Sequence, residues 1–132
     1  MKLVFTNGCF DILHVGHLRL LQQARALGDL LVVGVNSDWS VSQLKGESRP
    51  VNRLWDRMEM LRGIRGIDVV IPFHDLTPEN LVRAIRPDIL VKGPGYSFEN
   101  APEARAAAEW GAELVVVQGP PISTTKILER LG

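Results

Sequence analysis

The chain has 132 residues, a length that suits one domain with a single core. Its 15 basic and 15 acidic side chains leave no formal net charge, which disfavours a general nucleic-acid binder and permits small anionic ligands. With 45% hydrophobic residues and a single cysteine, Cys9, disorder and an internal disulfide are both excluded. No signal peptide or membrane-length apolar run is present, so we expect a cytoplasmic protein without membrane contact.

Short apolar runs alternate with amphipathic segments along the chain. The runs are rich in valine, isoleucine and leucine without polar alternation, which favours parallel strands covered on both faces. They fall at residues 3–5, 30–35, 69–71, 89–91 and 114–117. Helical spacing predicts helices at about 18–27, 54–64 with Asn52 as N-cap, 77–86 with Thr77 as N-cap, 102–110, and from 123–125 to the C-terminus.

This alternation predicts an α/β fold, a Rossmann-like doubly wound five-stranded parallel sheet in a single domain over residues 1–132. Ligands bind such sheets beyond the carboxyl ends of the strands, where the strand order reverses. A site is therefore expected among loops 6–17, 36–53, 72–77, 92–101 and 118–125. The stretch from about Asn36 to Arg53 is expected to be irregular, and long loops in compact domains are often functional.

The first of these loops ends in His14-Val15-Gly16-His17. Two histidines three residues apart share one face of a starting helix, and a helix N-terminus attracts phosphate. Gly16 leaves room for phosphate oxygens at the backbone. Metal binding is the competing interpretation, but it usually needs a third ligand, and His74 lies in another loop. The pattern therefore favours a phosphate site.

Residues 7–17 resemble the signature of the cytidylyltransferase-like nucleotidyltransferases, and residues 122–127 resemble that family's second signature at the start of the last helix. Residues 35–38, 45–52 and 90–93 are similar to the adenylyltransferases of ADP-heptose synthesis. The glycerol-3-phosphate cytidylyltransferases are a related branch with another substrate. The resemblance extends over essentially the whole chain.

The resemblance implies Mg²⁺-dependent transfer of an adenylyl group from ATP to a heptose 1-phosphate, with pyrophosphate as leaving group. CTP with glycerol 3-phosphate is the alternative pair, and another phosphorylated acceptor such as FMN stays open. An alternative of another class is a non-catalytic nucleotide-binding module, and a redox flavodoxin-like domain is a more distant one. The resemblance also implies a homodimer, no nucleic-acid partner, and no metal ligand among the assigned side chains.

By the same resemblance, His14 and His17 stabilise the α-phosphate and Lys45 contacts the triphosphate or the acceptor phosphate. The implied nucleotide-binding residues are Cys9, Phe10, Asp11, Gly16, Arg57, Lys92, Gly93, Ser123, Thr124 and Thr125. Asp11 has three open interpretations, which are orienting the loop, orienting a metal-bound water, and capping the turn. Arg49 is a further candidate for the acceptor. Trp39 and Trp55 border either the acceptor pocket or a dimer interface.

Two segments depart from the relatives' pattern. Residues 118–121, Gln-Gly-Pro-Pro, lack the arginine that cytidylyltransferases carry before the second signature. After Lys92-Gly93 the chain continues Pro94-Gly95-Tyr96, where the heptose branch usually has an acidic residue. The reaction type therefore follows from the motifs more directly than the substrate does.

Overall fold

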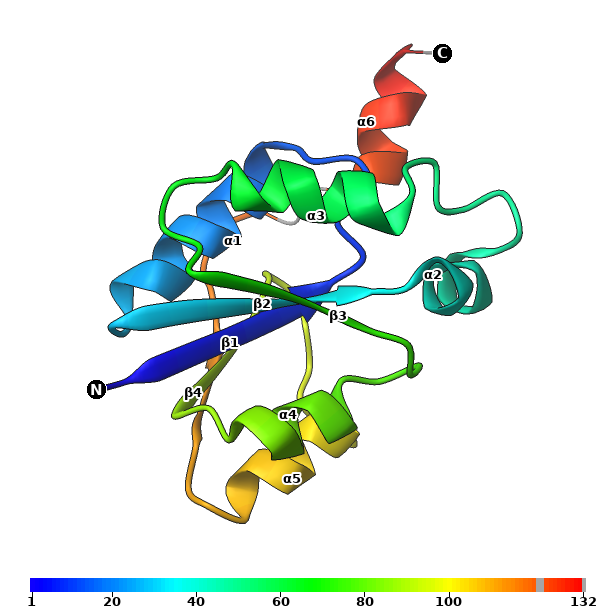
Figure 1. The fold of residues 1–132 in the computed structure, drawn as a ribbon. Helices are drawn as coiled ribbons and strands as arrows, with labels where there is room; N and C mark the ends of the chain where they lie inside the picture. The colour runs from blue at the N-terminus through cyan, green and yellow to red at the C-terminus, as the bar shows by residue number, and fades with distance from the viewer. Residues whose placement is uncertain (121–122, 132) are drawn as a thin grey trace.

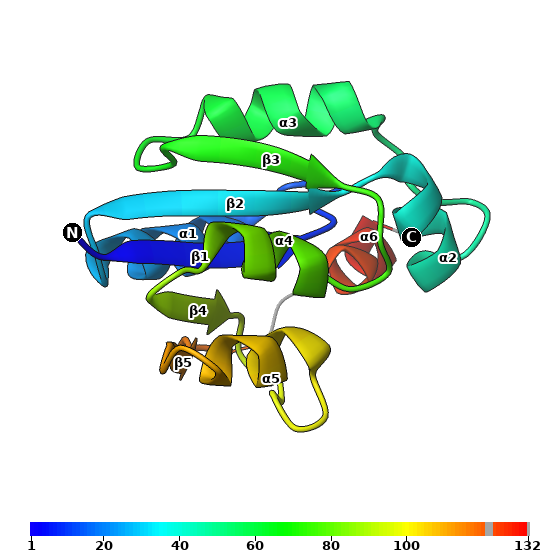
Figure 2. The ribbon, with the colours of Figure 1, turned by 60° about the horizontal axis from the view of Figure 1, so that its bottom comes forward.

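The computed structural model describes residues 1–120 and 123–131, without the side chains of Thr124 and Thr125. Five strands form one parallel sheet in the order β3-β2-β1-β4-β5 (Figures 1 and 2). They are β1 (Leu3–Gly8), β2 (Leu30–Asn36), β3 (Val69–Phe73), β4 (Ile89–Lys92) and β5 (Glu113–Val116). The predicted α/β, doubly wound parallel sheet is confirmed.

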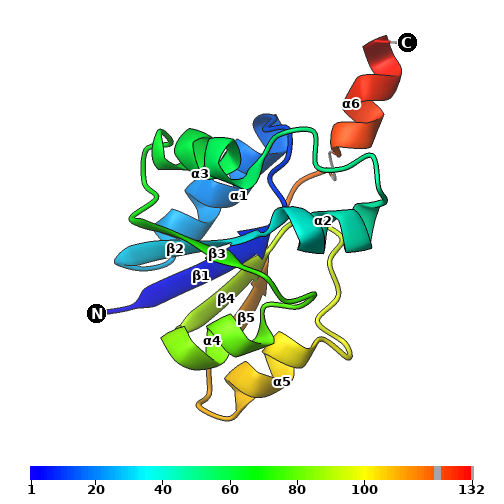
Figure 3. The same ribbon diagram turned by 45° about the vertical axis from the view of Figure 1, so that its right-hand side comes forward.

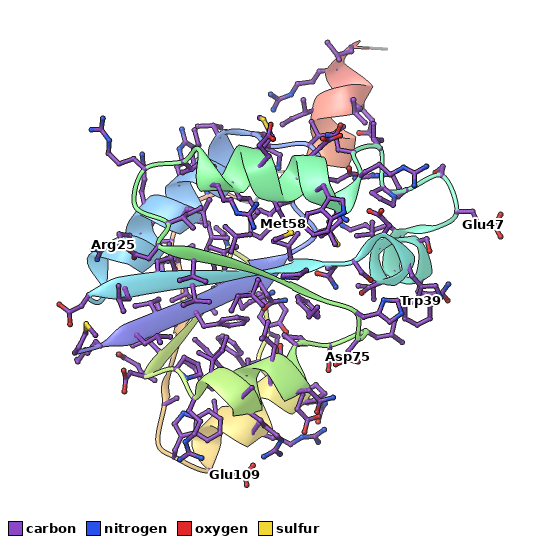
Figure 4. All side chains as sticks on the ribbon, in the orientation of Figure 1. Arg25, Trp39, Glu47, Met58, Asp75 and Glu109 are labelled. Carbon is purple, nitrogen blue, oxygen red and sulfur yellow. The ribbon has the colours of Figure 1, made fainter. Side chains whose placement is uncertain are left out.

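Helices cover both faces of the sheet (Figure 1). On one face lie α1 (Val15–Ala26) and α3 (Leu54–Arg62), and on the other α4 (Glu79–Ile85) and α5 (Pro102–Ala108). Each face has its own apolar core, because β1 and β2 bury side chains on both sides. Met58 points from α3 into the first core (Figure 4), and Val82 of α4 packs with Phe5 in the second.

Strand β1 lies at the centre, where the winding direction reverses. It pairs with β2 on one side, with Gly8 opposite Val35, and with β4 on the other, with Phe5 opposite Leu90. The segments that follow β1 and β4 therefore leave the sheet side by side. A ligand site in this fold class is expected at this point.

One predicted element is wrong. The stretch from Asn36 to Arg53 is not irregular throughout, because it contains a helix, α2 (Asp38–Lys45). Ser37 caps this helix, and its Oγ accepts a hydrogen bond from the backbone N–H of Ser40 at 3.2 Å. A helix of eight residues is too short for apolar periodicity to reveal, although Ser37-Asp38 is a recognisable helix-start pair.

Two predicted helix caps are displaced by one residue. Helix α3 has Arg53 rather than Asn52 as its N-cap, because the Asn52 side chain is bonded elsewhere. Helix α4 is capped at Pro78 rather than Thr77. The last helix, α6 (Thr124–Leu131), projects from the body of the molecule, beyond the ends of the strands (Figures 1 and 3). Within the described residues, none of the helices has the length and apolarity to cross a membrane.

Candidate active site

The turn after β1 has a strained backbone at Phe10. This residue has a φ of 49°, a conformation that side-chain-bearing residues adopt at a cost, and its ring is buried. Gly8 makes room for the ring, since a Cβ there would stand 3.1 Å from Cε2 of Phe10. The Phe10 ring lies against His17, with the ring centroids 5.2 Å apart. The turn thus fixes one face of the His17 imidazole.

His14 and His17 cap the start of α1 with their side chains. Nδ1 of His14 accepts from the backbone N–H of Gly16 at 3.1 Å, and Nδ1 of His17 accepts from that of His14 at 3.2 Å. The two rings stack with centroids 3.9 Å apart. Because both Nδ1 atoms are acceptors, each neutral ring carries its proton on Nε2. The pair therefore presents two Nε2–H donors beside the helix N-terminus.

Both imidazoles have a pKa below that of a free histidine. Burial, and then the electrostatic effect of the neighbouring His14 and Lys45, lowers the pKa of His17 from 6.5 to about 4. Burial also lowers the pKa of His14. An anion bound at the pair would favour protonation, because an opposite charge stabilises the charged form of a histidine. The site can thus donate hydrogen bonds to an anion, and the charge of that anion would stabilise the protonated imidazoles.

Asp11 organises the loop that leads to α3. Its carboxylate, 4% exposed, accepts from Nε of Arg49 at 2.7 Å and from the backbone N–H groups of Val51 at 2.9 Å and Asn52 at 2.8 Å. Burial alone would raise its pKa, but the hydrogen bonds from Asn52, Val51 and Arg49 hold that pKa below the ordinary value. Of the three interpretations left open by the sequence, the contacts in the structure match loop orientation.

Arg57 lies beneath the site, and this differs from the phosphate-contacting position expected from sequence. Its side chain is 1% exposed and sits on the inward face of α3. Its donors reach Asn52 O at 3.0 Å, Cys9 O at 2.8 Å, Asn36 O at 2.7 Å and Asp38 Oδ1 at 2.8 Å. The guanidinium therefore ties together the segments after β1, after β2 and before α3.

Lys45 reaches the site from the last residue of α2. The first turn of α2 is fastened to the loop after β3, with Oγ of Ser40 donating to Asp75 O at 2.9 Å. Trp39 stacks on His74 with centroids 4.8 Å apart, and Figure 4 shows Trp39 beside Asp75. Trp39, one of the two tryptophans whose role the sequence left open, therefore helps to position α2. Trp55 is 72% exposed on α3.

Lys92 ends β4 and is bonded to β1. Its Nζ donates to the carbonyl oxygen and the Oδ1 of Asn7, both at 3.2 Å, and stands 4.8 Å from the ring centroid of Tyr96. Burial lowers the Lys92 pKa. Tyr96 in turn donates its hydroxyl to Oε1 of Glu103 at 2.7 Å. Sequence reasoning missed Glu103, which looks like an ordinary first-turn acid although it shares a face of α5 with the buried Ala106 and Ala107.

Two cavities share the His17 side chain. The larger, of about 400 Å³, is lined by His17 together with residues from the loops after β1, β2, β3 and β4, among them Cys9, Phe10, Asp11, Lys45, Arg49, Lys92 and Glu103. The smaller, of about 150 Å³, lies between α1 and the ends of β4 and β5, and is lined by residues that include His14, Gly16, His17, Gly93 and Gly119. His17 belongs to both, so a ligand in either cavity can reach it.

The remaining predicted site residues differ in where the structure places them. Cys9 lines the larger cavity, and burial raises its thiol pKa, which does not favour a nucleophile. Oγ of Ser123 accepts from the backbone N–H of Lys126 at 3.1 Å and so caps α6. The side chains of Thr124 and Thr125 lie outside the described part of the chain, so their phosphate contacts stay a prediction. Among the described residues there is no group of three or more His, Cys, Asp or Glu side chains placed to hold a metal ion.

The fold and the histidine pair define a class of structure, a doubly wound parallel α/β domain with two stacked imidazoles at its switch point. Residues 5–130 match the family described as cytidylyltransferase-like, and the chain belongs to that family. The family resemblance expected from the two signatures is thereby confirmed.

The chain is also similar to individual proteins of known sequence or structure. The chain is 49% identical over 131 residues to the bifunctional protein HldE of Pseudomonas paraeruginosa, but spans only 28% of that protein's length. The crystal structure of the lipopolysaccharide core biosynthesis protein from Thermoplasma volcanium superposes on this chain with a TM-score of 0.78. The match covers 92% of this chain and 99% of that one, with 28% sequence identity. Pantothenate synthetase from Thermus thermophilus, 17% identical with a TM-score of 0.61 over 95% of this chain and 58% of that one, shares the fold.

Proposed function

We propose that this chain transfers an adenylyl group from ATP to a sugar phosphate, a heptose 1-phosphate, and releases pyrophosphate to form ADP-heptose. The observation that supports the proposal is that two cavities share His17, so two substrates could meet at this side chain. The relative from Thermoplasma volcanium is named for lipopolysaccharide core biosynthesis, which points to saccharide chemistry. The similarity to HldE also supports a saccharide phosphate as the acceptor.

In this proposal the nucleoside occupies the smaller cavity and the acceptor the larger one. A phosphate oxygen of the acceptor attacks the α-phosphorus of ATP, a new P–O bond forms, and the bond to the β-phosphate bridging oxygen breaks. Pyrophosphate leaves with that electron pair. The nucleophile is already an anion, so catalysis needs positioning and charge stabilisation rather than a strong base.

In this proposal, side chains and backbone groups around the two cavities stabilise the charge of the reacting phosphates. The Nε2–H groups of His14 and His17 donate to the α-phosphate, and the N-terminal N–H groups of α1 add their dipole. Lys45 and Arg49 line the larger cavity and offset the charge of the acceptor phosphate or of the leaving group. Mg²⁺ would be held by the triphosphate oxygens, which are its natural ligands, and would offset their charge, so this chain need supply only donors and cations around that complex.

Pyrophosphate release from each pairing of a triphosphate and an acceptor tests the proposal. ATP and CTP are each combined with heptose 1-phosphate, glycerol 3-phosphate and FMN, in the presence of Mg²⁺. We expect the highest kcat/KM for ATP with the heptose phosphate. Turnover restricted to CTP and glycerol 3-phosphate would reassign the substrates. Nucleotide binding without pyrophosphate release from any pair would indicate a non-catalytic module instead.

A further inference from the structure

The wall of the larger cavity formed by the ends of β4 and α5 carries a buried carboxylate. Glu103 lines the cavity and is only 3% exposed. Its Oε1 accepts the Tyr96 hydroxyl at 2.7 Å, which is the one hydrogen bond to this carboxylate among the described residues. No fully enclosed polar side-chain atom of those residues lacks a partner, so Oε2 is accessible from the cavity and is suited to accept from a ligand.

The orientation of this carboxylate is fixed by its neighbours. The Tyr96 ring packs edge-on against Phe98, with centroids 5.2 Å apart, and lies under Nζ of Lys92 at 4.8 Å. Lys92 is anchored to Asn7 on β1, so the row Asn7–Lys92–Tyr96–Glu103 is continuous from the central strand to α5. Burial and the Glu103 carboxylate raise the pKa of Tyr96, which keeps its hydroxyl a donor at neutral pH. Glu103 is thus a preorganised acceptor.

The two sides of the cavity differ in the groups that they leave for a ligand. On one side His17, Lys45 and Arg49 supply imidazole and cationic donors, and the Asp11 carboxylate there is already bonded to the protein. On the other side Glu103 supplies an anionic acceptor, and the nearby Lys92 ammonium is already bonded to Asn7. A second anionic group of the ligand would be repelled at Glu103, but hydroxyl groups would donate to it. The ligand that matches both is phosphorylated at one end and carries free hydroxyls at the other.

We propose that Glu103, oriented by Tyr96, recognises hydroxyl groups of the acceptor, which is therefore a polyol or sugar phosphate. This inference rests on the proposed function and assigns a specificity-determining residue to it. The ribose of the nucleotide has similar hydroxyls, but the smaller cavity, beyond Gly16 and Gly93, is the one assigned to the nucleoside. Glu103 thus determines which acceptors enter.

The test compares Glu103→Gln, which keeps the size of the side chain, with Tyr96→Phe and Glu99→Gln. Glu99 is an exposed acid near the same loop and serves as the matched control. We expect Glu103→Gln to raise the KM for the sugar phosphate about 10- to 100-fold, because a charged acceptor is lost, with the KM for ATP within about twofold. Tyr96→Phe should raise the acceptor KM less, and Glu99→Gln should leave it unchanged.

Deoxy acceptors identify the interaction. Wild type should discriminate against the monodeoxy sugar phosphate that lacks the recognised hydroxyl, and Glu103→Gln should lose that discrimination. An unchanged acceptor KM in Glu103→Gln, or a rise in the ATP KM instead, would overturn the assignment while leaving adenylyl transfer intact. If the wild-type protein turns over no acceptor, the proposed function fails. The assignment of Glu103 is then tested by calorimetric measurement of heptose phosphate binding. Binding weakened by Glu103→Gln supports the assignment, whereas equal or absent binding overturns it.

Discussion

His14 and His17 fasten the backbone of the same helix start at which phosphate binding is proposed. Each Nδ1 accepts a backbone N–H, at 3.1 Å from Gly16 and at 3.2 Å from His14, and within the described part of the chain neither Nε2 has a hydrogen-bond partner. Asparagine at the N-cap and glutamine three residues later normally make such caps. Substitution can therefore separate the structural use of the imidazoles from their chemical use.

The cap-preserving variants His14→Asn and His17→Gln should lose turnover and keep stability. Removing one preorganised donor to developing charge typically costs about 100- to 1000-fold in kcat. The amide oxygens still accept the backbone N–H groups, so we expect a melting temperature within about 2 °C of wild type. Steady-state kinetics and a thermal melt of each variant check this.

The alanine variants supply the comparison for that experiment. His14→Ala removes both the donor and the cap, so it should lose about 1 kcal/mol of stability in addition to the same loss of turnover. If His17→Gln retained wild-type kcat while its melting temperature fell, the imidazole would be a structural group only.

Stability should fall as the pH drops from about 6.5 towards 4. The folded protein lowers the pKa of His17 from 6.5 to about 4, so within this window the unfolded chain binds more protons than the folded one. The contribution is complete above pH 6.5, and its loss amounts to at most about 3 kcal/mol. Urea unfolding at several pH values between 7.5 and 4.5 measures it, and this range lies above the titration of Asp11, whose pKa is lowered from 3.8. In His17→Gln the slope should be shallower, and an unchanged slope would refute the burial argument.

Replacing Arg57 should destabilise the whole protein. Arg57→Met leaves the carbonyl groups of Cys9, Asn36 and Asn52 without their donor, and loss of one partner in such a buried charged network costs about 3–5 kcal/mol. Arg57→Lys should recover only part of this, because an ammonium cannot span the same acceptors. Chemical denaturation measures both. Arg62→Met, at an exposed position of the same helix, should change stability by less than about 0.5 kcal/mol.

Asp11→Asn should loosen the loop between α2 and α3. The amide loses the charge that attracts Arg49 and turns an N–H group towards the backbone donors of Val51 or Asn52. We expect faster tryptic cleavage at Lys45 and Arg53, a higher acceptor KM, and a loss of about 1.5–3 kcal/mol. Asp56→Asn, at an exposed position on α3, is the control. Equal cleavage rates in the two variants would contradict the role given to Asp11.

The sheet could be predicted because its strands are continuous apolar runs, and a candidate site could be proposed because doubly wound sheets bind ligands at the switch point. Helix α2 could not, since eight residues give no periodicity and its position depends on contacts of Ser40 and Trp39 with the loop after β3. A sequence shows which residues are polar, but not which of them are buried.

Arg57 and Glu103 illustrate that limit. The family resemblance places Arg57 among the nucleotide-binding residues, and Glu103 looks like an ordinary charged residue of an amphipathic helix, yet both are nearly inaccessible to solvent. Arg57 is enclosed because the carbonyl groups around it come from three separate segments, and Glu103 because Tyr96 meets it across a loop. Such partnerships follow from tertiary structure and leave no local pattern in the sequence.

The position of Arg57 also has a consequence for how the site comes into being. The strand and helix that carry the histidines are complete by residue 26, and β2 by residue 36. Yet the carbonyl groups of Cys9 and Asn36 find their shared donor only when α3 packs onto the sheet. A partly synthesised chain that ends before α3 therefore has the signature histidines without a formed turn to hold them. The proposed nucleotide site is therefore a property of the assembled domain and not of its first strand and helix.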